Sequence, residues 1–169
     1  TQHGENVLNA DVKYLAAECH LSLQNYAQAK VFLNELTQNY TGHDEIDSWR
    51  VRNGFCSYLQ KNYRETIESL LPYVDKLKDA ETIAEAKFYL GASLFYLEEY
   101  ADDIEALTAS HAADPTWQKA DEALLFLSRA QRGSNAFDDA RATVRRLIDN
   151  YTKNNLLDRA WYRLGEYHY

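Results

Sequence analysis

The most informative segment of the sequence is Gly91-Ala92-Ser93-Leu94-Phe95-Tyr96-Leu97-Glu98-Glu99-Tyr100, in which Tyr100 follows Gly91 after nine positions. The same combination recurs at steps of 37 residues, as Ala17 with Tyr26, Gly54 with Tyr63, Gly91 with Tyr100, and Ser128 with Phe137. One further step leads to Gly165. Because a small residue lets two helices approach closely and an aromatic side chain fills the gap between them, the pattern predicts a repeated helix pair.

Each repeat is expected to contain two amphipathic helices with a short polar connection. Residues 82–97 are rich in Ala and Leu at helical spacing, and the helix that follows is expected to stop at Asp114-Pro115. We expect first helices at 8–24, 45–60, 81–97, 117–132 and 156–169, and second helices at 26–39, 63–77, 100–113 and 137–150. The sequence therefore predicts an all-α fold, a right-handed α-solenoid of antiparallel helix pairs.

The domain organisation follows from the same step. We expect one solenoid over residues 1–169, with units at about 10–46, 47–83, 84–120 and 121–157 and the first helix of a fifth at 158–169. The chain begins at Thr1 and contains no Met, so we expect it to be a fragment of a longer protein. Trp161, Leu164 and Tyr167 have no following helix to cover them, which predicts either continuation of the chain or self-association through this end.

Composition excludes several classes of function. The chain has 18 basic and 26 acidic residues and a formal net charge of −8, which disfavours binding of a nucleic-acid backbone. Only 6 Gly and 2 Pro occur, so a turn-rich β fold is not expected. No apolar run approaches the roughly 18 residues of a membrane helix. We therefore expect neither a nucleic-acid partner nor direct insertion into a membrane.

The residues that carry chemistry form no recognisable catalytic constellation. The sequence has no Gly-rich phosphate loop, no Gly-x-Ser-x-Gly and no His-Glu-x-x-His, and its five His residues are scattered. Cys19 and Cys56 are one repeat apart, a separation that puts them beyond disulfide reach, so we expect free and buried thiols. The sequence predicts no enzyme, no cofactor and no metal site.

The stretch Ala160-Trp161-Tyr162-Arg163-Leu164-Gly165 closely resembles the opening of a tetratricopeptide repeat (TPR). Several other residues fall on the signature positions of that family: Leu90, Gly91, Tyr100, Leu107, Pro115, Ala29 and Ala140. Thr66 and Asp103 depart from it, and Asp103 is the odder departure because the family's position is tight and apolar. The resemblance covers the chain from about Leu8 onward and implies the fold more strongly than a function.

The length of the repeat indicates a branch of this family. The usual TPR period is about 34 residues, whereas this one is 37. The longer unit, with phrases such as those at 147–151 and 162–167, resembles bacterial cell-envelope proteins of the TolA-binding and β-barrel-assembly lipoprotein type. That resemblance implies a periplasmic adaptor, and a cytoplasmic protein is the alternative.

The resemblance also implies a binding groove lined by the first helices. Carried onto this chain, the family's groove positions include Tyr14, Phe55, Tyr58, Phe88, Phe95, Arg129, Arg132 and Tyr162. We expect the four Phe55, Tyr58, Phe88 and Phe95 rings to form an aromatic strip that buries side chains of a protein or peptide partner. Arg129 and Arg132 would hold an acidic group. The alternative is that these aromatic residues are internal packing.

The function predicted from the sequence is a non-catalytic scaffold or adaptor that binds a partner segment in its concave groove. Two alternatives remain open. The array could be a structural spacer or oligomerisation segment that acts through its ends, or the regulatory arm of a larger multidomain protein.

Overall fold

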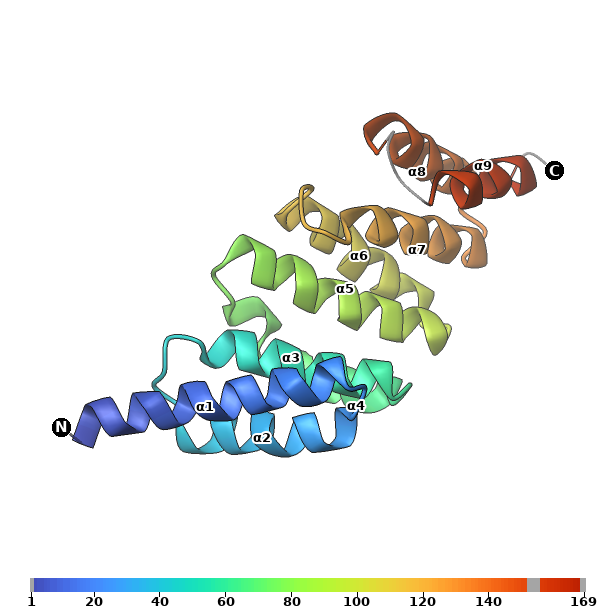
Figure 1. Ribbon diagram of the computed structural model, residues 1–169. Helices are drawn as coiled ribbons and strands as arrows, with labels where there is room; N and C mark the ends of the chain where they lie inside the picture. Colours follow the sequence, from blue (N-terminus) through green and yellow to red (C-terminus); the bar gives the residue numbers. More distant parts are fainter. Residues whose placement is uncertain (1, 152–155, 168–169) are drawn as a thin grey trace. The chain divides into compact units, whose positions relative to one another are not determined.

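In the computed structural model, residues 2–151 and 156–167 are described, and all the regular elements within these ranges are helices (Figure 1). The chain divides into two compact units, Thr1–Leu77 and Lys78–Tyr169. Each unit is built from successive helices that pack against their neighbours in the sequence.

The first unit contains four α-helices followed by a short 3₁₀ helix. They are α1 (Gln2–Ser22), α2 (Tyr26–Asn39), α3 (Ile46–Leu59), α4 (Tyr63–Leu70) and η1 (Val74–Lys76). The core between α1, α2 and α3 is formed by small residues with Leu33, Leu36 and Trp49. Trp49 is 1% exposed, and its ring stacks on His43 with 4.5 Å between centroids. This indole is therefore the centre of the first unit's core.

The described residues of the second unit form five α-helices. They are α5 (Ala80–Tyr96), α6 (Tyr100–Ala113), α7 (Ala120–Gly133), α8 (Phe137–Asn150) and α9 (Leu157–Glu166). Helix α5 packs against both α6 and α7, and each later helix packs against the next (Figure 1). Leu107, Leu124, Val144 and Leu147 are fully buried between them. The helical periodicity thus places apolar side chains on the faces that are buried in this unit.

The turn inside each helix pair has one backbone geometry. The second helices begin at Tyr26, Tyr63, Tyr100 and Phe137, the aromatic residues of the sequence pattern. Two residues earlier the backbone is left-handed, at Gln24, Lys61, Glu98 and Asn135, with φ between 58° and 64°. The next N–H then bonds back to the first helix, as Glu99 N does to the Leu94 carbonyl at 3.0 Å. This geometry closes the C-terminus of the first helix.

The small residues allow the close helix contacts that the sequence predicts. A Cβ added to Gly54 would lie 2.7 Å from the Leu70 side chain, and one added to Gly91 would lie 2.6 Å from Cγ of Leu107. Both distances are shorter than a van der Waals contact, so an added Cβ would displace the Leu70 or Leu107 side chain. Gly165 differs, since a Cβ there would meet nothing within 4 Å.

Several predicted helix boundaries are wrong. Helix α4 ends at Leu70 instead of continuing to 77, because Pro72 has no N–H to extend the helical hydrogen bonds. Helix α1 begins at Gln2 instead of 8, and α7 begins at Ala120 instead of 117. The delay before α7 is a turn in which the Asp114 carboxylate accepts a hydrogen bond from Thr116 N at 2.8 Å. The predicted end of the last helix, at 168–169, lies outside the described residues.

The two thiols are free, as predicted, but only one of them is buried. Cys56 is buried, and burial raises its pKa to about 11. Cys19 is exposed, so the prediction that both are buried is wrong for this residue. The one-repeat spacing put them at equivalent positions, but Cys19 faces solvent from the first helix of its unit.

Candidate functional site

The first unit holds three of the predicted groove residues, all half-buried on its first helices. The Tyr14 ring of α1 lies 6.4 Å from that of Trp49, and burial raises the pKa of Tyr14. The Tyr58 ring of α3 lies 6.0 Å from that of Tyr63. Each tyrosine thus packs against an aromatic ring of another helix and remains partly exposed.

Phe55, the third of these residues, lies beside an ion pair that links the two first helices. The Arg52 guanidinium is 5.8 Å from the centre of the Phe55 ring. Arg52 Nε is also 3.4 Å from a carboxylate oxygen of Glu18 on α1. The positive charge of Arg52 beside Phe55 is therefore paired with the negative charge of Glu18 in the same unit.

Phe88 is a core residue in the structure. Its ring is 1% exposed and makes edge contacts with Trp117 at 5.4 Å, Phe126 at 5.9 Å and Tyr89 at 5.3 Å. A ring covered in this way offers no surface to a partner. At this position the structure therefore agrees with the alternative interpretation of the sequence, in which the aromatic residue is internal packing.

Phe95 and Arg129 lie together on the second unit. The Arg129 guanidinium carbon is 4.4 Å from the centre of the Phe95 ring and 5.3 Å from that of Phe126. The Phe95 and Phe126 rings meet edge to face at 5.5 Å, and Tyr96 contacts both. Cation–π contacts of this kind hold the guanidinium in place. Helices α5 and α7 thus hold the Arg129 guanidinium against the rings of Phe95 and Phe126.

The positive charge of Arg129 is not balanced by an ion pair of its own among the described residues, although the neighbouring Arg163 pairs with Glu166 at 2.5 Å. Burial lowers the pKa of Arg129, and the positive charges of Arg163 and Arg159 on α9 lower it further. Within the described part of the chain Arg129 makes no ion pair. Asp103 is the acidic group that interacts with it, but burial raises the pKa of Asp103 to about 8. That carboxyl is largely neutral at pH 7, so Arg129 lacks a charged partner.

Arg132 lies one turn beyond Arg129 on α7, and Tyr162 lies on α9 with Arg159 and Arg163. The exposed Arg132 guanidinium is 5.8 Å from the Tyr167 ring, and Arg163 is 5.7 Å from the Tyr162 ring. Tyr162 is 65% exposed and, with Asp158, lines a shallow cleft of about 230 Å³ on α9. We call the set Phe95, Tyr96, Phe126, Arg129, Arg132, Arg159, Tyr162 and Arg163 the arginine–aromatic surface.

Three members of this surface, Tyr96, Phe126 and Arg163, were not singled out from the sequence, whereas Arg159 stands at a position that the resemblance assigns to the groove. Arg159 and Arg163 are four residues apart, a spacing that places them on one helix face, and this signal was available. Phe126 and Tyr96 carry no such signal. Each comes directly after a residue that the resemblance assigns to the groove, and since a helix turns by about 100° per residue, the following side chain is expected to point to another side. The predicted strip that runs from Phe55 and Tyr58 to Phe95 joins residues of both units and stays a prediction.

The last helix is partly exposed. Trp161 is 58% exposed and Leu164 is half-buried, whereas Tyr167 is 3% exposed. Arg141 donates a hydrogen bond to the Tyr167 carbonyl at 2.8 Å. Of the three apolar residues expected to lie uncovered at this end, Tyr167 is therefore covered by its own unit.

The described residues contain no group of three or more His, Cys, Asp or Glu side chains that could hold a metal ion. Among the same residues, no helix combines the length and the apolar character needed to cross a bilayer.

Comparison with known proteins identifies the fold. No family profile matches the sequence, and no curated protein matches it. Among solved structures, the apo form of RapI matches with a TM-score of 0.75 at 14% identity, over 85% of this chain and 56% of RapI. TPR-like repeats of a kinesin light chain from Podosopora anserina match with a TM-score of 0.75 at 11% identity, over 95% of this chain and 85% of theirs.

A MamA double mutant (RS-1 ArsTM) matches with a TM-score of 0.71 at 15% identity, over 94% of both chains. These likenesses confirm the predicted fold class, an all-α solenoid of TPR-like repeats. At such low identities they show the fold alone. The chain spans little more than half the length of RapI.

Proposed function

We propose that the chain is a non-catalytic protein-interaction module that binds an acidic segment of a partner protein on the arginine–aromatic surface. The observation that supports this most directly is Arg129, a half-buried cation stacked on Phe95 and Phe126 with no ion pair in the described part of the chain. TPR-like folds present such first-helix surfaces to partner segments.

The electrostatics favour a carboxylate as the bound group. Burial is the main cause of the lowered pKa of Arg129, and repulsion by Arg163, which itself pairs with Glu166, and by Arg159 lowers that pKa further. A carboxylate placed among them would relieve this repulsion and accept charge-assisted hydrogen bonds from a guanidinium already held in position. Arg132, exposed on the same helix, would attract the same group over a longer range.

The aromatic side chains would supply the remaining affinity. Tyr96 is 45% exposed and Tyr162 is 65% exposed, so both rings can be covered by apolar side chains of the partner. Buried aromatic anchors of this kind contribute about 2 kcal/mol or more each in known interfaces. In the first unit, taken by itself, the half-buried Tyr14, Phe55 and Tyr58 would offer a partner-binding surface of their own.

The test is a pull-down with mass spectrometry on wild type, Arg129→Gln and Arg145→Gln. Arg145 is an exposed arginine on the second helix α8 and serves as the matched control. We expect proteins captured by wild type and by Arg145→Gln to be lost with Arg129→Gln. Capture of the same proteins by all three chains would contradict the proposal. Far-ultraviolet circular dichroism establishes that each variant is folded.

Self-association is the second candidate, and Trp161 is the observation that favours it. Its indole is 58% exposed on α9, next to the exposed ring of Tyr162. Two copies could cover these rings mutually, which is the oligomerisation alternative. Light scattering across a range of concentrations tests it: a mass that rises with concentration and falls to the monomer in Trp161→Glu supports it, and a constant monomer mass excludes it.

A periplasmic adaptor of the cell-envelope type is a narrower form of the first proposal. It rests on the sequence resemblance alone. The open reading frame around this chain tests it, because an export signal upstream would place the protein in the envelope and its absence would favour the cytoplasm.

A further inference from the structure

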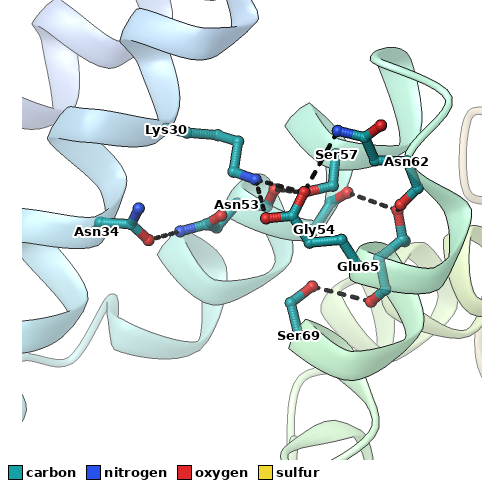
Figure 2. A network of polar contacts seen from close by, with 9 residues as sticks. Lys30, Asn34, Asn53, Gly54, Ser57, Asn62, Glu65 and Ser69 are labelled. Carbon is teal, nitrogen blue, oxygen red and sulfur yellow. Dashed lines mark hydrogen bonds and ion pairs between the residues drawn. The ribbon is translucent and has the colours of Figure 1, made fainter.

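The first unit contains a polar cleft of about 440 Å³ that the proposed function does not use. Residues of α2, α3 and α4 and of the turn after α4 line it, and Figure 2 shows the polar contacts among several of them. Except for Pro72 and Tyr73, its lining consists of charged, amide and hydroxyl side chains. Its volume lies within the range of about 300–1,000 Å³ typical of ligand sites.

The cleft lies on a different face of α3 from the predicted groove. Arg50 and Asn53 line it, whereas Phe55 and Tyr58 belong to the first-helix surface. At 3.6 residues per turn these two pairs point to different sides of the helix. A ligand in the cleft would therefore contact the second helices, α2 and α4.

The cleft is held in shape by an internal network of polar contacts (Figure 2). Lys30 Nζ donates to Ser57 Oγ at 2.9 Å and pairs with a carboxylate oxygen of Glu65 at 2.5 Å. The hydrogen bond from Lys30 lowers the pKa of Glu65. Asn62 Nδ2 donates to the other oxygen of the same carboxylate at 3.4 Å. These contacts join α2, α3 and α4 and fix the walls of the cleft before any ligand arrives.

Two amide side chains in the cleft leave one donor group and one acceptor unused. Asn53 Nδ2 donates to Asn34 Oδ1 at 2.5 Å (Figure 2). In the described part of the chain, no other partner is found for Nδ2 of the exposed Asn34 or for Oδ1 of the half-buried Asn53. Exchange of donor and acceptor between the two amides would leave the same pair of groups. A peptide group offers one C=O acceptor and one N–H donor, so a main chain in the cleft could bond to both of these groups.

Arg50 provides a site for a carboxylate next to these amides. Its guanidinium carbon lies 4.1 Å from the centre of the Tyr73 ring, a cation–π contact that holds the group in place. Nη1 forms an ion pair with Asp47 at 3.1 Å, and the remaining N–H groups, which have no further partner among the described residues, stay available. A positioned guanidinium edge binds a carboxylate bidentately.

From these contacts we infer that the cleft binds an extended peptide segment of a partner protein, with a main-chain amide on Asn34 and Asn53 and an Asp or Glu side chain on Arg50. A polyanion such as a nucleic acid fits less well, because Glu65 and Glu68 line the same cleft and Lys30 is already paired. The ligand is therefore a nearly neutral polar chain with a single carboxylate at the cleft.

Selection from a library of random dodecapeptides displayed on phage tests this inference. The wild-type chain of 169 residues is the bait, and the affinities of the enriched peptides are measured by fluorescence anisotropy for four variants. Arg50→Gln and Asn34→Ala alter the cleft, Asn39→Ala is an exposed control at the end of α2, and Arg129→Gln alters the arginine–aromatic surface. Thermal melts establish that each variant is folded.

We expect a class of enriched peptides that contain Asp or Glu and bind at least tenfold more weakly to both cleft variants. The same peptides should bind Asn39→Ala and Arg129→Gln as they bind wild type. The inference is overturned if no peptide is enriched, or if the cleft variants bind every enriched peptide as wild type does. Peptides lost only with Arg129→Gln overturn it while supporting the proposed function, so the two failures are distinguishable.

Discussion

At the scale of single residues, Asp103 is the strongest departure from the repeat pattern. Its side chain is completely buried between helices of the second unit, and neither carboxyl oxygen has a hydrogen-bond partner among the described residues. Burial raises its pKa to about 8, although the charge of Arg129 opposes this shift. An unpaired buried carboxyl of this kind destabilises the folded state.

The predicted consequence is a stability that falls as the pH rises. An unfolded Asp has a pKa of about 3.9. Between that value and about 8, the folded chain binds more protons at Asp103 than the unfolded chain does, so the free energy of unfolding declines with pH across this window and levels off above it. Asp103→Ala should remove this decline and stabilise the chain by about 1–3 kcal/mol at pH 7, with a smaller gain at pH 5.

Urea unfolding at several pH values measures this effect. Asp102→Ala, at the exposed neighbouring position, is the matched control and should keep the pH dependence of wild type. If Asp103→Ala retained the same decline between pH 5 and pH 8, the raised pKa of Asp103 would be ruled out as its cause.

At the scale of elements, the contact between α5 and α6 depends on Gly91. A Cβ at this position would lie 2.6 Å from Cγ of Leu107 and 3.2 Å from the backbone N of the same residue. Because backbone cannot yield as a flexible side chain does, Gly91→Ala should force the helices apart. We expect a loss of about 1–3 kcal/mol in the free energy of unfolding, measured by urea denaturation.

Gly165→Ala is the control for that substitution. It occupies the equivalent position two repeats later, but a Cβ there meets nothing within 4 Å. Since Ala is a better helix former than Gly by up to about 1 kcal/mol, this change should leave stability unchanged or raise it slightly. Equal losses from both substitutions would show that close approach of α5 and α6 is not what Gly91 provides.

The elements themselves were largely predictable from the sequence, because local signals determine them. The aromatic residues Tyr26, Tyr63, Tyr100 and Phe137 mark the beginning of each second helix in the structure as they do in the pattern. The early end of α4 was missed although Pro72 signalled it, since the repeat was extended to equal length in every unit. Periodicity predicts which elements exist better than where each one stops.

The candidate site was less predictable, because exposure depends on neighbouring helices. Phe88 and Phe95 occupy similar positions on one helix, yet Phe88 is covered by Trp117 and Phe126 whereas Phe95 is half-exposed under Arg129. The spacing of residues in the sequence predicts which face of a helix a side chain lies on, but it does not predict which neighbouring side chains cover that face. The polar cleft was missed for the same reason, since Lys30, Asn34 and Asn53 have the spacing of ordinary solvated residues.

At the scale of the whole molecule, each of the two compact units has a core of its own. Trp49 is 1% exposed in the first unit, and Trp117 is 5% exposed in the second. In a repeat protein, stability is approximately a sum of local terms and nearest-neighbour terms. The units can therefore differ in stability, and the two indoles report on them separately.

Leu36→Ala tests this division. Leu36 is fully buried in the first unit, so its truncation should cost about 2–5 kcal/mol there. In chains that keep a single tryptophan, with Phe at the other two positions, urea unfolding followed by fluorescence should show a lower midpoint for Trp49 and a smaller shift for Trp117. The reciprocal variant in the second unit, Leu147→Ala, should shift the Trp117 midpoint more, because Leu147 is equally buried. If both indoles moved by the same amount in both variants, the 169 residues would unfold as one cooperative body, and the two cores would not be independent contributors to its stability.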